Sequence, residues 1–124
     1  MNQLFKTIGR IIFVLPIAVF GLFHFLNGKA MTGIVPGWLP FPLFWVYFTG
    51  VIHIVAAVFI IGKFKYANYA SLILSALILF YVLFIHLPVV LGGGPQAQMS
   101  MMSLLKDLTM AGGLLFFAGY LSEY

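Results

Sequence analysis

The chain has 124 residues, of which 64% are hydrophobic and only 6% are charged, and its formal net charge is +4. Soluble domains contain roughly 45 to 50% apolar and about 25% charged residues, so this composition excludes an ordinary soluble core and predicts a membrane protein. The chain contains no cysteine, which excludes a disulfide framework, a thiolate nucleophile and cysteine-ligated metal sites.

Four apolar runs are long enough to cross a bilayer, which takes roughly 20 residues per helix. They cover residues 4–26, 43–61, 66–91 and 100–121, so residues 1–124 are predicted to be a single transmembrane domain. The runs lack the alternation of strands, and backbone groups in hydrocarbon have to be paired within their own segment. The predicted fold is therefore all-α, an antiparallel four-helix transmembrane bundle. No small-residue cleavage site follows the first run, which is expected to be a retained span.

The connector between the first and second runs is rich in proline and tryptophan, including Pro36, Trp38 and Pro40. Proline cannot continue a helix, and tryptophan is favoured where a membrane meets water. We expect this connector to lie at the outer interface. Its tryptophan is then either an interfacial anchor or part of a lid that folds back over the helices.

The basic residues lie near the ends of the apolar runs, which predicts contacts with lipid headgroups and no role with nucleic acid. Four lie on the side of the termini and two on the other side: Lys6, Arg10, Lys63 and Lys65 against Lys29 and Lys106. Because basic residues concentrate on the cytoplasmic side, both termini are predicted to be cytoplasmic. We expect an integral protein of the bacterial inner membrane.

Ionisable side chains within a span cost on the order of 2.5 to 3.5 kcal/mol when charged, so they normally face other helices. His24, His86 and Asp107 are predicted to lie at one depth on the outer side, and His53 near the midplane. These four residues form the predicted polar core or ligand site. For each histidine the alternative is a hydrogen-bonded packing residue. For Asp107 the alternative is a helix start, where a carboxylate favours the helix dipole.

Three stretches resemble the DoxX family of small four-span membrane proteins: Gly21-Leu22-Phe23-His24-Phe25, Val35-Pro36-Gly37-Trp38-Leu39-Pro40 and Thr49-Gly50-Val51-Ile52-His53. The resemblance covers almost the whole chain. It implies a redox role that depends on partner subunits, since DoxX-like proteins include subunits associated with quinone-linked sulfur oxidation and oxidative-stress complexes. Many of these relatives have glutamate where this chain has His53.

The preferred functional hypothesis is an accessory subunit of a membrane redox or respiratory assembly, with a quinone or hydrophobic-ligand pocket near the outer face. Three alternatives stay open. The first is a structural subunit without a ligand, and the second is a transporter or chaperone component that uses His53 as a proton-responsive group. The third and less favoured alternative is a haem carrier with His24 and His86 as axial ligands. Other membrane subunits and further copies of the chain are the expected partners. A self-contained enzyme is disfavoured, because no nucleophile with a base and no carboxylate pair is visible.

Overall fold

The computed structural model describes residues 2–122, and over these residues it consists of helices and connecting turns, without β-strands. Its elements in chain order are α1 (Asn2–Leu26), α2 (Gly28–Met31), the short 3-10 helix η1 (Thr32–Ile34), α3 (Pro42–Gly62), α4 (Ala67–Tyr81), the π-helical turn η2 (Val82–His86), α5 (Leu87–Gly92) and α6 (Ala97–Leu121). The prediction of an all-α protein is confirmed.

Four continuous helical segments are long and apolar enough to cross a membrane: Asn2–Leu26, Pro42–Gly62, Ala67–Gly92 and Ala97–Leu121. The third of these joins α4, η2 and α5 into one segment. The expected apolar runs differ little from these bounds, the largest difference being a start at Ala97 in place of residue 100. Large apolar side chains cover much of the outer surface, where soluble proteins rarely expose so many.

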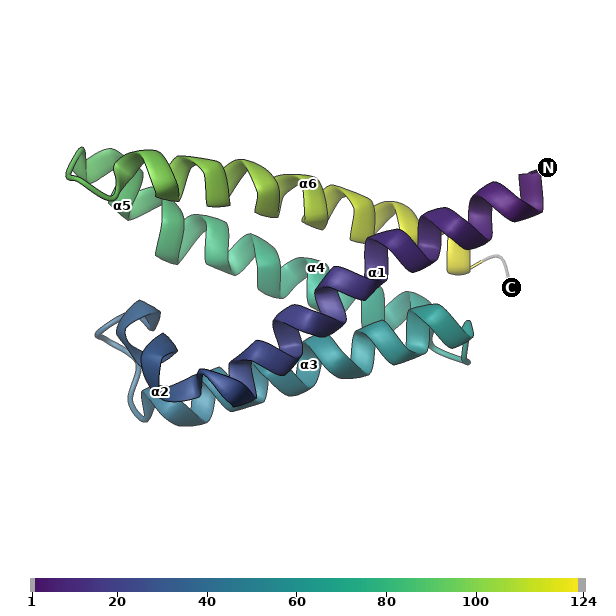
Figure 1. Cartoon of the computed structure of the whole chain (residues 1–124), viewed down its shortest axis with the longest axis horizontal. Helices are drawn as coiled ribbons and strands as arrows, with labels where there is room; N and C mark the ends of the chain where they lie inside the picture. The colour runs from purple at the N-terminus through teal and green to yellow at the C-terminus, as the bar shows by residue number, and fades with distance from the viewer. Residues whose placement is uncertain (1, 123–124) are drawn as a thin grey trace.

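The long helices pack as two antiparallel pairs, α1 with α3 and α4 with α6, and α3 also contacts α4. Figure 1 shows that the two pairs come together toward the end of the molecule where α1 begins and α6 ends. They diverge toward the opposite end, where α2 and α5 lie. This divergence leaves room between the pairs for the cavity described below.

Small polar side chains tie α4 to α6 at the centre of the molecule. The Ser71 hydroxyl donates a hydrogen bond of 2.6 Å to the Leu114 carbonyl, and the Ser75 hydroxyl donates one of 2.9 Å to the Ala111 carbonyl. Both serines are completely or almost completely buried, beside apolar core residues such as Leu74. Hydrogen bonds of this kind hold helices together where the surroundings are apolar.

Two glycines bring α1 and α3 into close contact. A Cβ atom added at Gly21 would lie 2.8 Å from the Ile54 Cγ1 and 2.9 Å from the His53 Cβ. One added at Gly50 would lie 2.7 Å from the His24 Cβ. Only glycine therefore fits at this crossing, and the crossing places His24 and His53 side by side.

Candidate functional site

A cavity of about 610 Å³ lies between the two helix pairs at their divergent end. Its wall is built from α1, the connector after α2, α3, α4, η2 and α6, and most of the lining side chains are apolar or aromatic. Both tryptophans of the chain, Trp38 and Trp45, belong to the wall. The volume falls within the range of roughly 300 to 1,000 Å³ that is usual for small-molecule sites.

The connector between α1 and α3 forms one side of this cavity. Trp38 lies edge-on to Phe80 and Phe84 of the opposite helix pair, with ring centroids 6.4 and 6.1 Å apart. At the start of α3 the Trp45 indole N–H donates a hydrogen bond of 2.8 Å to the Pro40 carbonyl, which attaches the connector to the helix. The connector thus reaches the opposite helix pair through Trp38, whose side chain is nevertheless 64% exposed.

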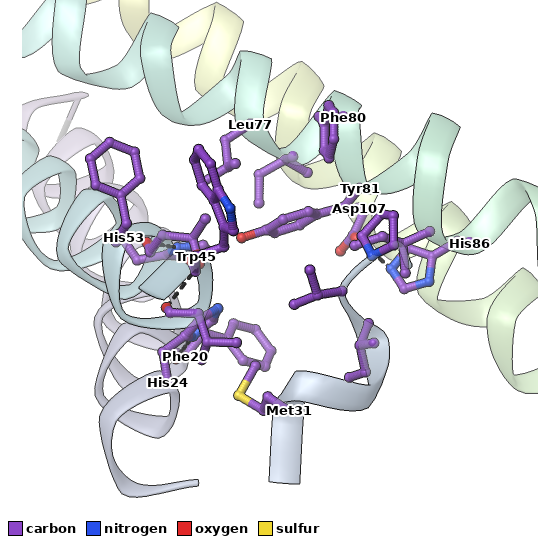
Figure 2. Close-up of a pocket in the computed structure, with 18 of the residues that line it drawn as sticks. Phe20, His24, Met31, Trp45, His53, Leu77, Phe80, Tyr81, His86 and Asp107 are labelled. Carbon is purple, nitrogen blue, oxygen red and sulfur yellow. Dashed lines mark hydrogen bonds and ion pairs between the residues drawn. The ribbon is translucent and has the colours of Figure 1, made fainter. Parts of the chain in front are cut away.

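His24 on α1 and His53 on α3 form a ring pair in the wall of the cavity, with centroids 4.9 Å apart and planes inclined by 34° (Figure 2). Each ring is held by a hydrogen bond to the carbonyl one turn earlier in its own helix. The His24 Nδ1 lies 2.6 Å from the Phe20 oxygen, and the His53 Nδ1 lies 2.8 Å from the Thr49 oxygen. Their exposed fractions are 8% and 2%, so both histidines are buried, and both line the cavity.

Tyr81, at the end of α4, lies on the other side of His53. The two rings are nearly parallel, with centroids 6.2 Å apart and an angle of 14° between their planes. Figure 2 shows the Tyr81 hydroxyl directed into the cavity from α4. This hydroxyl is buried and has no hydrogen-bond partner.

A charged cluster occupies a separate part of the wall. The His86 Nε2 lies 3.0 Å from one Asp107 carboxylate oxygen, and the Lys106 ammonium lies 3.5 Å from the other. Lys106 also lies 4.6 Å from the centre of the Phe20 ring, as in a cation–π contact. Asp107 is buried, whereas Lys106 is half exposed.

The helix-start alternative for Asp107 is wrong. The helix α6 begins at Ala97, so Asp107 lies ten residues, or about 15 Å, along the helix and far beyond its first turn. The carboxylate instead faces His86 on the π-helical turn η2 and lies beside Lys106, and π-helical turns occur frequently at functional sites.

All four predicted site residues line the same cavity, but they form two pairs and not one group. His24 lies beside His53, and His86 is bonded to Asp107. No contact joins His24 to His86 in the part of the chain that the structure describes. In residues 2–122 there is also no group of three or more histidine and acidic side chains that could hold a metal ion.

The sequence analysis did not identify Tyr81 as part of the site. It lies within a long apolar run, one position away from the stripe that includes Ser71, Ser75 and Val82, so its spacing gave no signal. The one available indication was that Tyr81 carries the only polar side-chain group between Ser75 and His86.

Fold and site together define a small helical protein with four helices suited to crossing a membrane and an apolar cavity with polar groups in its wall. The chain belongs to the family described as Domain of unknown function (DUF8561), whose model matches residues 13–103. The assignment to the DoxX family is therefore wrong. The matched region includes His24, His53 and His86 and ends before Asp107. No match was found among curated proteins or among solved structures.

Proposed function

We propose that this chain is an integral membrane protein that binds a small, mostly apolar molecule in the cavity between its helix pairs. The four helices form an antiparallel bundle across the inner membrane of a bacterium, with both termini in the cytoplasm. Support for the membrane comes from the length and hydropathy of the helices and from their apolar outer faces. Support for the orientation comes from the excess of basic residues near the termini and the α3–α4 turn.

The observation that carries the ligand proposal is the cavity itself. Close packing is the rule in protein interiors, and large voids lose dispersion contacts along their whole surface. Here a partly open cavity of about 610 Å³ is lined by aromatic and other apolar side chains together with a few polar groups, which is the usual character of a small-molecule site.

The redox role and the quinone were expectations drawn from the DoxX resemblance, and they lose that support. The proposal therefore derives the ligand from the cavity walls alone. These walls favour a compact molecule with a large apolar surface and a small number of hydrogen-bonding groups. The chain by itself then serves as a binding protein, a carrier or a sensor of such a molecule.

The first experiment is the extraction of small molecules from the protein purified in a mild detergent, followed by mass spectrometry. The expected result is an apolar compound present in a fixed ratio to the protein. Leu77 lines the cavity, so the variant Leu77→Trp should fill it and abolish retention. Leu72, on the same helix, is exposed and lies outside the cavity, so Leu72→Trp is the matched control and should retain the compound. Equal retention by both variants would refute binding in this cavity.

The orientation is tested separately with reporters fused after Tyr124. A reporter that works only in the cytoplasm should be active, and one that works only after export should be inactive. Replacing Lys63 and Lys65 by glutamine reduces the excess of basic residues on that side and should produce a mixture of orientations. Activity of the exported reporter in the unaltered protein would contradict the proposed topology.

A further inference from the structure

The part of the cavity wall formed by α1, α3 and α4 presents three polar atoms that have no hydrogen-bond partner in residues 2–122. They are the Nε2 atoms of His24 and His53 and the hydroxyl of Tyr81. All three residues line the cavity, and their rings form a continuous row with His53 in the middle. The hydrogen bonds that these atoms can donate or accept define the chemical group of a ligand that would pair with them.

In their neutral form the two histidines can only accept a hydrogen bond through Nε2. A carbonyl oxygen has no hydrogen to donate, so the contacts of Nδ1 with the Phe20 and Thr49 carbonyls require a hydrogen on Nδ1 of each ring. In a neutral imidazole the hydrogen is then absent from Nε2, which carries a lone pair.

Tyr81 supplies the opposite function. Its hydroxyl is a donor as well as an acceptor, and it is directed into the cavity without a partner. Thr49 lines the same cavity, but its hydroxyl donates to the carbonyls of Trp45 and Val46 and makes no hydrogen bond of acceptable geometry with Tyr81. Leaving a buried hydroxyl unpaired is costly, so a ligand atom that accepts from it gains affinity.

We infer that the molecule bound in the cavity carries a hydroxyl group, as in a phenol or an apolar alcohol, that donates to the His53 Nε2 and accepts from the Tyr81 hydroxyl. This inference rests on the proposed function and narrows its ligand class. A ketone or an ether would accept from Tyr81 but leave the histidine lone pairs unused. A carboxylate would meet those lone pairs with its own and be repelled. A hydroxyl group is the simplest group that both donates to the histidine lone pair and accepts from the Tyr81 hydroxyl.

Three probes of nearly the same shape separate the two hydrogen bonds. They are 2-naphthol, which donates and accepts, 2-methoxynaphthalene, which only accepts, and naphthalene, which does neither. Affinities are measured by isothermal titration calorimetry on the full chain in detergent, and free concentrations are corrected by titrating the detergent micelles alone. For the unaltered protein we expect 2-naphthol to bind about 2- to 10-fold more tightly than 2-methoxynaphthalene, which is the range for one neutral hydrogen bond.

The variants assign each bond to a residue. Tyr81→Phe should weaken binding of both oxygen-containing probes by about 2- to 10-fold and leave naphthalene unchanged. His53→Leu should weaken 2-naphthol alone. Tyr69→Phe removes a hydroxyl from an exposed position on the same helix, outside the cavity, and should change none of the three affinities.

The outcomes distinguish this inference from the proposed function. If none of the three probes binds the unaltered protein, the apolar binding site itself is refuted, and the inference with it. If all three bind with equal affinity and Tyr81→Phe changes nothing, the apolar site stands and the hydroxyl inference is refuted. The comparison of probes in the unaltered protein decides the question even if His53→Leu does not fold.

Discussion

The close crossing of α1 and α3 provides the sharpest test of the structure. In the variant Gly21→Ala, the added Cβ would lie 2.8 Å from Ile54 Cγ1, 2.9 Å from the His53 Cβ and 3.1 Å from the Gly50 carbonyl oxygen, where ordinary contacts start at 3.4 Å. A Cβ and a carbonyl cannot rotate out of the way, so the helices have to separate by roughly half an ångström. Overpacking of this kind typically costs about 1 to 3 kcal/mol.

The matched control is Gly9→Ala, in the same helix, where an added Cβ would meet nothing within 4 Å. Alanine is favoured over glycine inside a helix by about 0.8 to 1 kcal/mol, and both variants share this gain. The difference between them is therefore the cost of the crossing alone. We expect Gly21→Ala to be less stable than Gly9→Ala by about 1 to 3 kcal/mol.

The assay is the free energy of unfolding in mixed micelles, obtained by titrating a denaturing detergent and following helix content by circular dichroism. Gly50→Ala should behave like Gly21→Ala, because its added Cβ would lie 2.7 Å from the His24 Cβ. Both changes displace the His24–His53 ring pair and should also weaken binding of 2-naphthol. Equal stability of Gly21→Ala and Gly9→Ala would show that α1 and α3 do not cross as described.

Three further predictions concern the polar contacts. Ser71→Ala and Ser75→Ala should each lower the free energy of unfolding by about 0.5 to 2 kcal/mol, because each removes a hydrogen bond between α4 and α6, and a change below measurement error in both would contradict these contacts. A double-mutant cycle of His86→Ala with Asp107→Ala should give a coupling of about 1.5 to 3 kcal/mol, the range for a hydrogen bond to a charged group, whereas strict additivity would show that the two side chains do not meet. His24→Ala and His86→Ala, by contrast, should be additive within about 0.5 kcal/mol, since they belong to different pairs, and a larger coupling would restore the single polar group expected from the sequence.

The helices were predictable because charge and hydropathy change abruptly at their ends. Their buried faces were also predictable, since small and polar residues recur at helical spacing. The step from Gly21 to His24 in the first helix and from Ser71 to Ser75 in the third marks the side that contacts other helices, and all four residues are buried. These signals come from residues that are close in the sequence, so they predict the buried face of a helix without knowledge of how the helices are arranged.

The pairing of the polar residues was not predictable, because it depends on how far the two helix pairs diverge. Depth along the helices placed His24 and His86 at one level, but depth says nothing about lateral distance. The family assignment failed for a related reason. Short stretches of glycine, proline and aromatic residues, such as 35–40, recur in membrane helices and their connectors by composition alone, and they carry little information about descent.

The π-helical turn at Val82–His86 ends two residues before Pro88. Proline has no N–H to donate and its ring collides with the carbonyl four residues earlier, that of Phe84, so the regular α-helical hydrogen-bond pattern is disfavoured at this point. The wider turn accommodates the collision by holding one more residue than an α-helical turn, which changes the rotation of everything after it by about 100°. The angular position of His86 opposite Asp107 thus depends on the wide turn that precedes Pro88. Replacing Pro88, or deleting one residue within the turn, would favour regular α-helical winding through this segment. His86 and α5 would then be rotated relative to each other about the helix axis. The residue at position 88 therefore influences which side of the helix faces the cavity.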